Sequence, residues 1–166
     1  MTTRVALSRK SIQTKKLLDA AENRHAQTQQ PYTHMILPPD QGHNMVQELS
    51  RGITGKIAER FRKKANIDES AFSSIIGYSR MHYSRLAKDG NKQLRGAASN
   101  RLYRFAQILE HAIDLYNGDE QTALKWLKTP NVAFDNTTPL AMLSSEVGAD
   151  MVDGLIAQLE LGILPA

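Results

Sequence analysis

The 166-residue sequence predicts an all-α protein built from short and medium helices. Apolar residues recur at three- and four-residue spacing through several segments, which places them on one face of a helix. No run alternates apolar and polar residues for long enough to indicate a strand. We therefore expect helices to form the whole core.

The first 43 residues are interpreted as an arm followed by a linker. Residues 9–29 have a thin apolar face and predict a helical arm. Residues 28–43 contain the helix breakers Pro31, Pro38, Pro39 and Gly42, which predict an extended connector. The arm and linker carry six basic and three acidic residues. They are interpreted as a solvated extension, with a phosphate contact as the alternative.

Residues 44–65 predict one amphipathic helix. Its apolar residues recur at every fourth position and form a single stripe: Met45, Leu49, Ile53, Ile57, Phe61 and Ala65. The opposite face is basic and carries Arg51, Lys56, Arg60, Lys63 and Lys64.

A helix-turn-helix is predicted over residues 69–88. Phe72 and Ile76 fit a short first helix, Gly77 suits the tight turn, and Ser79 can cap a second helix that ends near Lys88. A DNA-reading motif needs these parts in this order, with the exposed face of the second helix in the major groove. Tyr78, Tyr83 and Leu86 are expected to face the core with Phe72 and Ile76.

The second half predicts a long helix, two short elements and a last helix. Ser99 can start the long helix, which ends near Asn117 and Gly118. A short helix over residues 119–128 places Trp126 inward as a core anchor, and Thr138 opens a turn. The last helix covers residues 147–162, with Met151, Leu155 and Leu159 at four-residue steps.

Charge is strongly segregated along the chain. Residues 1–43 carry a net charge of +3, residues 44–111 carry +7, and residues 112–166 carry −6. A basic middle suits a polyanion such as nucleic acid, which would repel the acidic C-terminal block. The two ends of the chain are therefore expected to have different partners.

The outward face of the second motif helix is the candidate DNA-reading surface. Arginine can make forked contacts with guanine edges, and serine and lysine can bind bases or phosphates. The residues assigned to DNA binding are Ser79, Arg80, Met81, Ser84, Arg85, Lys88, Lys92 and Arg95. Two packed helices with a solvated basic face are the alternative. The thirteen basic residues between positions 44 and 111 favour DNA binding.

The sequence gives no positive support for an enzyme, a cofactor or a metal site. It has no cysteine, which excludes disulfides and thiolate ligands and fits a cytoplasmic protein. No two of the five histidines share a helical turn, and Gly52 and Gly55 do not form a phosphate-binding loop. No apolar run is long enough for a membrane span, and the N-terminus lacks the apolar core of a signal peptide.

The C-terminal segment has a distinctive order of short signatures. They are Trp126-Leu127, Pro130-Asn131, Thr138-Pro139, Gly148 and Gly162. This order resembles the toxin-binding domain of the Xre/MbcA/ParS antitoxin family, the partners of RES-domain toxins. The similarity continues upstream through Ser99, Arg101 and the helix-turn-helix, and covers about residues 44–166.

The resemblance implies three regions and a function. The regions are an N-terminal arm and linker (1–43), an Xre-like helix-turn-helix domain (44–118) and a toxin-binding domain (119–166). The implied function is that of a type II antitoxin, which binds a NAD-consuming RES toxin directly and represses its own operon. In this family the C-terminal end plugs or borders the toxin's active-site cleft. Carried onto this sequence, the toxin-binding residues are Leu159, Gly162, Ile163, Leu164 and Pro165.

The residues themselves agree with this implication but leave alternatives. The acidic C-terminal block ends in the apolar tail ILPA, which can meet a basic nucleotide-binding cleft or tuck into the core. A homodimer is expected, because paired helix-turn-helix units suit two-fold symmetric operators. One alternative is a stand-alone transcriptional repressor, which gives no reason for the acidic block. Another is an interaction protein whose motif no longer binds DNA, which the retained basic face disfavours.

Overall fold

The computed structural model describes residues 31–37 and 45–163. Within these residues it contains nine α-helices, one 3-10 helix and a single two-stranded sheet, so the all-α prediction is confirmed. The predicted helix over residues 9–29 lies outside the described residues. In the described ranges, no helix has both the length and the apolarity needed to cross a membrane.

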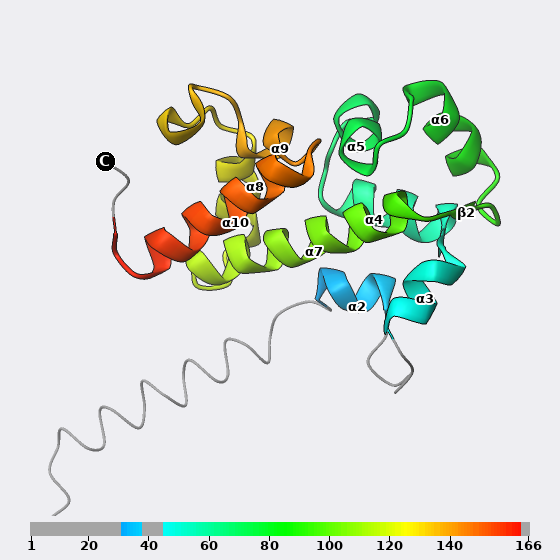
Figure 1. Ribbon diagram of the computed structural model, residues 1–166, viewed down its shortest axis with the longest axis horizontal. Helices are drawn as coiled ribbons and strands as arrows, with labels where there is room; N and C mark the ends of the chain where they lie inside the picture. The colour runs from blue at the N-terminus through cyan, green and yellow to red at the C-terminus, as the bar shows by residue number, and fades with distance from the viewer. Residues whose placement is uncertain (1–30, 38–44, 164–166) are drawn as a thin grey trace, which may run out of the picture.

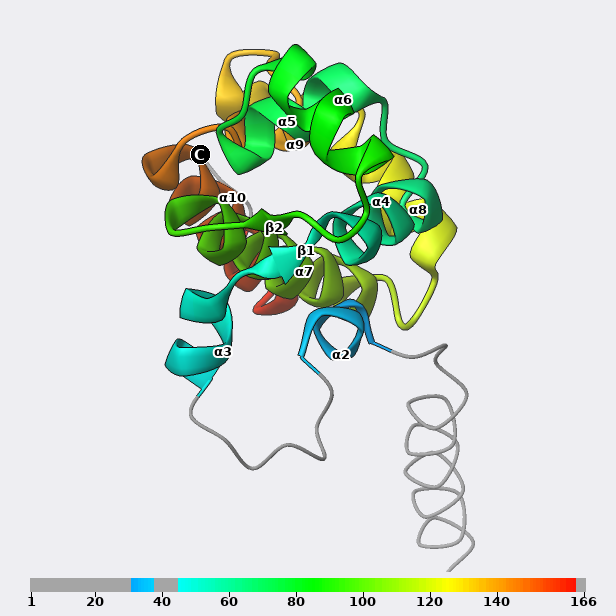
Figure 2. The ribbon, with the colours of Figure 1, turned by 90° about the vertical axis from the view of Figure 1, so that its right-hand side faces the viewer.

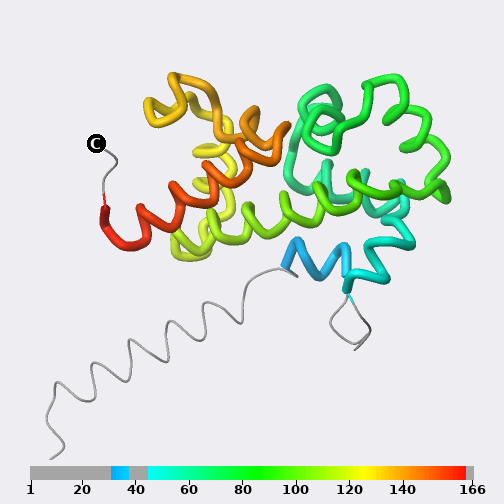
Figure 3. The backbone as a smooth tube through the Cα atoms, viewed as in Figure 1, coloured from blue at the N-terminus to red at the C-terminus, as the bar shows by residue number. Residues whose placement is uncertain are grey.

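The long helix α7 (Ala97–Leu115) is the spine of the molecule. Figure 1 shows it running through the middle of the molecule, and the tube in Figure 3 follows the same path. Helices α4 (Gly55–Lys64), α5 (Glu69–Ile76) and α6 (Arg80–Lys88) lie near its start. Helices α8 (Glu120–Leu127), α9 (Pro139–Met142) and α10 (Glu146–Glu160) lie toward its end.

The core is continuous along α7 and centres on aromatic rings. Phe61 of α4 has its ring centroid 5.2 Å from that of Phe105 on α7 and 6.1 Å from that of Phe72 on α5. Tyr32 meets the same Phe61 ring edge-on at 4.9 Å. All four side chains are essentially fully buried. The buried residues of α8, α9 and α10 belong to the same cluster, so the two halves of the molecule share one hydrophobic core.

The extended connector predicted for residues 28–43 is wrong where the structure describes it. Residues Tyr32–Ile36 form a helix, α2, that begins directly after Pro31. Proline is acceptable at a helix start because it has no amide hydrogen to satisfy there. Tyr32 and Ile36 are buried, and the carboxylate of Glu110 on α7 accepts bonds from the Thr33 amide and hydroxyl at 2.7 and 2.9 Å.

The single helix predicted over residues 44–65 is also wrong, because the chain breaks at Gly52. Helix α3 (Met45–Arg51) ends there, and strand β1 (Ile53–Thr54) follows before α4 begins. Gly52 has φ +97°, and a Cβ at this position would lie 2.3 Å from the Leu94 carbonyl oxygen. Strand β1 pairs antiparallel with β2 (Gln93–Leu94), with Ile53 opposite Leu94. Met45 is exposed, although its stripe partners Leu49 and Phe61 are buried.

Ser99 lies inside α7 and does not cap it. The helix begins after Gly96, and the buried Ser99 hydroxyl donates to the Leu94 carbonyl at 2.7 Å. The Ser99 hydroxyl oxygen also accepts a hydrogen bond from the Ile53 amide at 3.2 Å. Ser99 therefore ties both strands to the spine. The predicted helix end is confirmed, since Asn117 and Gly118 both have positive φ.

The C-terminal half is a series of short, capped elements. After α8 come the 3-10 helix η1 (Val132–Phe134), α9 and α10. Asn131, Thr138 and Ser145 each accept a backbone amide hydrogen at the start of η1, α9 and α10 respectively. These caps satisfy amides that the short helices would otherwise leave without a partner.

Candidate functional site

The helix-turn-helix forms as predicted. Asp68 caps α5 and Ser79 caps α6, while Gly77 takes a left-handed conformation with φ +75° between them. Any side chain at Gly77 would also meet the Arg101 guanidinium, whose Nη1 lies 2.2 Å from the place of a Cβ. The turn is therefore fixed by backbone geometry and by its contact with α7.

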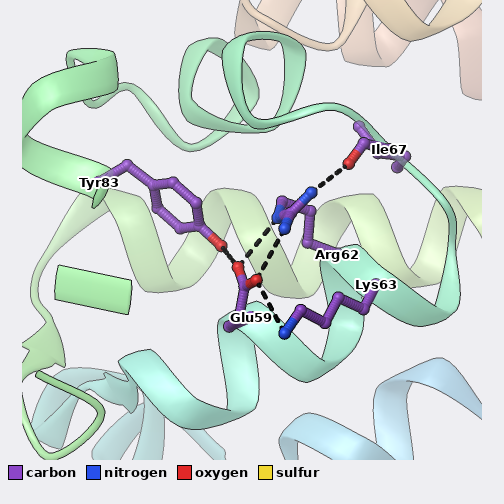
Figure 4. Close-up of polar contacts among 5 residues, drawn as sticks. All are labelled: Glu59, Arg62, Lys63, Ile67 and Tyr83. Carbon is purple, nitrogen blue, oxygen red and sulfur yellow. Dashed lines mark hydrogen bonds and ion pairs between the residues drawn. The ribbon is translucent and has the colours of Figure 1, made fainter. Parts of the chain in front are cut away.

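Tyr83 anchors the second helix of the motif to α4. Its ring is fully buried beside Phe72, at 5.2 Å between centroids, and its hydroxyl donates to Glu59 at 2.7 Å. Arg62 binds the same carboxylate through two nitrogens and donates to the Ile67 carbonyl at 2.8 Å. Figure 4 shows this network, which Lys63 joins from the solvent side. Spacing in the sequence gave no sign of it, because Glu59 and Tyr83 are 24 positions apart.

The network shifts the ionisation of its members. The two hydrogen bonds from Arg62 lower the pKa of Glu59 to about 2, and the Tyr83 hydroxyl adds to this effect. Burial, together with the bond to Glu59, raises the pKa of Tyr83. At neutral pH, Glu59 is therefore an ionised carboxylate and Tyr83 a neutral phenol.

The residues assigned to DNA binding lie on one end of the molecule, which Figure 2 views directly. Ser79, Arg80, Met81, Arg85 and Lys88 are exposed on α6, and Ser84 is half-buried. The Ser79 oxygen is occupied, since it accepts the His82 amide at 3.2 Å as the helix cap. Met81 contacts Arg85 through its sulfur.

Beside α6 the loop before α7 completes a basic hollow of about 500 Å³. It brings together Arg85, Lys92 and Arg95, all assigned to DNA binding from the sequence, and its lining also includes His82, Asn91 and Gln93. Lys92 also pairs with Asp89 at 3.2 Å. His82 stacks flat on Tyr78 at 4.3 Å, which gives it a packing role on this face. The hollow offers several hydrogen-bond donors beside one helix.

The opposite end of the molecule is acidic and carries exposed apolar side chains. Helix α10 lies alongside α7 (Figure 1). Acidic residues on α10 pair with basic residues on α7: Glu146 with Arg101 at 3.2 Å, Asp150 with Arg104, and Asp153 with His111 at 2.8 Å. The three pairs follow one another in the same order along both helices, so α7 and α10 run in the same direction.

The predicted toxin-binding residues fall into three groups. Leu159 is half-buried against the core, Gly162 turns the chain after α10 with φ +70°, and Ile163 is 53% exposed. Leu164 and Pro165 lie outside the described residues. Sequence reasoning missed the exposure of Met151, Val147 and Leu161, which are 46%, 70% and 75% exposed.

Several signature residues have clear structural roles. Gly148 lies in the first turn of α10, where a Cβ would come within 2.0 Å of the Met142 carbonyl oxygen. Asn131 and Thr138 are the caps of η1 and α9. Trp126 is half-buried and packs against the core, as predicted. Among the described residues there is no group of three or more metal-ligating side chains.

The described chain is an all-α protein with a basic helix-turn-helix at one end and an acidic helical unit at the other. Comparison with known proteins identifies the family. Residues 111–162 match the family described as the antitoxin Xre/MbcA/ParS C-terminal toxin-binding domain. The chain belongs to the Xre antitoxin family of toxin–antitoxin systems, which confirms the resemblance seen in the sequence.

Two curated relatives carry the match beyond this domain. The chain is similar to "Antitoxin Xre" of Photorhabdus laumondii, with 31% identity over 127 residues, covering 76% of this chain and 85% of the relative. It is also similar to "Antitoxin Xre" of Yersinia enterocolitica, with 29% identity over 128 residues and the same coverage. A toxin partner follows from membership in this family.

Proposed function

We propose that this antitoxin neutralises a NAD-consuming toxin of the RES type by direct binding and represses its own operon as a homodimer in the cytoplasm. The observation that carries the proposal is the separation of two unlike surfaces. Basic side chains surround α6 at one end, and the acidic helix α10 leads to an apolar chain end at the other. The two activities can therefore coexist on one molecule.

On the toxin side, the C-terminal end lies at the toxin's active site. Leu159 anchors the last turn of α10 to the core, and Gly162 redirects the chain beyond it. Ile163, Leu164 and Pro165 then make the apolar contact. An acidic helix beside this tail suits the basic cleft that a dinucleotide-consuming enzyme needs for its phosphates.

On the DNA side, α6 enters the major groove. Arg80 and Arg85 are exposed and can read guanine edges, while Lys88, Lys92 and Arg95 contact phosphates. In a homodimer, the two copies of α6 would lie about 34 Å apart to reach successive half-sites.

Truncation tests the toxin-binding half of the proposal. Removing residues 161–166 leaves α10 and its buried face intact, whereas a cut after Asn131 would also remove the core residues of α9 and α10. We expect the intact chain to rescue growth when co-expressed with the toxin of the adjoining reading frame. The chain ending at Glu160 should stay folded and fail to rescue. Equal rescue by both forms would exclude the tail as the neutralising element.

Titration of promoter DNA tests the repressor half. Replacing Arg80 or Arg85 with alanine should weaken specific binding by about 1–3 kcal/mol per residue. Lys125→Ala is the matched control, because Lys125 is exposed on α8 at the other end of the molecule. Promoter binding that is unchanged in both arginine variants would contradict the assignment of α6. A chain that binds its promoter but not the toxin would be a stand-alone repressor.

A further inference from the structure

Helix α10 carries an apolar stripe that the described residues leave exposed to solvent. Positions 147, 151, 154, 158 and 161 follow one another in steps of four and three residues, which keeps them on one side of the helix. They are Val147, Met151, Gly154, Gln158 and Leu161. All five are exposed, while the buried face carries Val152, Leu155 and Ile156.

The spacing of this stripe is that of a helix-packing seam. A four–three alternation is the period at which a second helix can lie along the first and insert its side chains between neighbouring ones. Val147, Met151 and Leu161 are 70%, 46% and 75% exposed. A surface helix of a folded domain usually presents polar residues on this side.

Gly154 marks the centre of the stripe. A glycine in the middle of a helix weakens it relative to alanine, so its presence calls for a reason. The described residues give none, because a Cβ at Gly154 would meet none of their atoms within 4 Å. Gly148 on the same helix differs, since the Met142 carbonyl oxygen forbids a side chain there. The missing side chain at Gly154 leaves room for something outside the chain.

Charge identifies the kind of partner. Helix α10 has no basic residue and carries four carboxylates, of which Glu146, Asp150 and Asp153 pair with α7 and Glu160 lies exposed near its end. Residues 112–166 have a net charge of −6, so two copies of this half repel each other. A cationic partner is attracted to the same surface, and this favours a foreign helix over a second copy of the chain.

We propose that the stripe on α10 receives a basic, amphipathic helix of the toxin, with the two helices closest at Gly154. This inference rests on the proposed toxin binding and extends it from the chain end to the whole length of α10. The backbone of a partner helix can approach most closely where a glycine removes the intervening side chain. The apolar side chains on either side of Gly154 would then interleave with those of the toxin.

The test is a pair of substitutions in the full-length chain, with the toxin of the adjoining reading frame as the binding probe. Gly154→Leu fills the space at the centre of the stripe and improves helix propensity, so its melting temperature should equal or exceed that of the wild type. Its affinity for the toxin should fall by at least tenfold. Gln121→Leu is the matched control, because it adds a leucine to an exposed position on α8. It should bind the toxin as the wild type does.

The second substitution is Met151→Lys, which places a positive charge on the stripe and opposes a cationic partner. It should also lower toxin affinity at least tenfold, whereas Val46→Lys, at an exposed position on α3, should not. Wild-type affinity in both stripe variants would overturn the inference while leaving toxin binding itself established. No binding by the wild type would overturn the proposed function and the inference together. A change in self-association alone, seen by sedimentation velocity, would identify the stripe as a self-interface and also overturn the inference.

Discussion

The two ends of the molecule present their surfaces by different physical means. At the helix-turn-helix end, exposed basic side chains stand on a helix that a buried aromatic ring and a bonded carboxylate hold in place. At the α10 end, several large apolar side chains are exposed among the carboxylates, and the polar contacts to α7 lie at the surface. Charge on a rigid frame suits a polyanion, whereas an apolar stripe suits a shaped protein partner.

The comparison predicts that substitutions of the buried residues that hold α6 in place will lower the free energy of unfolding the most. Tyr83→Ala removes a fully buried ring and leaves Glu59 without its phenol partner. We expect the free energy of unfolding to fall by about 3–5 kcal/mol, measured by urea denaturation. Tyr83→Phe keeps the ring and should lose only about 1 kcal/mol. Equal losses in the two variants would show that the hydroxyl, and not the ring, holds α6.

The elements that the sequence predicted well are those that depend on neighbouring residues. Gly77 and Ser79 define the motif because a turn and a cap need only the adjacent backbone. The break at Gly52 was missed because Ile53 fits the apolar period of a continuous helix. In the structure it is buried as well, but as part of strand β1, so the apolar period continues across the break.

Tertiary contacts account for most of the remaining errors. Ser99 looked like a cap, but its hydroxyl binds strand residues 5 and 46 positions away. Tyr83 was placed in the core from the sequence, whereas its partner Glu59 had no local signal. On α10, the four-residue step from Met151 to Leu155 hid the fact that Met151 is exposed while Leu155 is buried. Helical period alone does not say which face the rest of the chain will cover.

The second prediction concerns two glycines of one helix. Gly148→Ala places a methyl group within 2.0 Å of the Met142 carbonyl oxygen, so α9 or α10 must shift. We expect a loss of about 1–3 kcal/mol in unfolding free energy and weaker toxin binding. Gly154→Ala, which meets nothing, should instead gain about 0.5–1 kcal/mol. Similar changes in both variants, read by thermal melting, would contradict the contrast between the covered and open faces of α10.

The third prediction is a pH dependence that belongs to the α6 end. The pKa of Glu59 falls from its ordinary value of 4.5 to about 2 in the folded chain, mainly through its bonds to Arg62. A lowered pKa contributes stability that is present above pH 4.5 and is lost as the pH falls toward 2. We expect Glu59→Gln to cost about 1–2 kcal/mol at neutral pH, given that the site is partly open to solvent. The variant should also flatten the acid limb of a stability–pH curve, and an unchanged acid limb would rule out Glu59 as its source.

The smallest effect is expected from the ion pairs between α7 and α10. The side chains of Arg101 and Glu146 are 31% and 64% exposed, so water and salt screen their attraction. A double-mutant cycle with Arg101→Ala and Glu146→Ala should give a coupling of about 0–1 kcal/mol, and 1 M salt should reduce it further. The α10 end would then be held by its buried apolar face alone. A coupling above about 2 kcal/mol would instead show that ion pairs contribute substantially to the packing of α10 against α7. Because Arg101 also lies against the turn at Gly77, it would link the two ends of the molecule through one side chain.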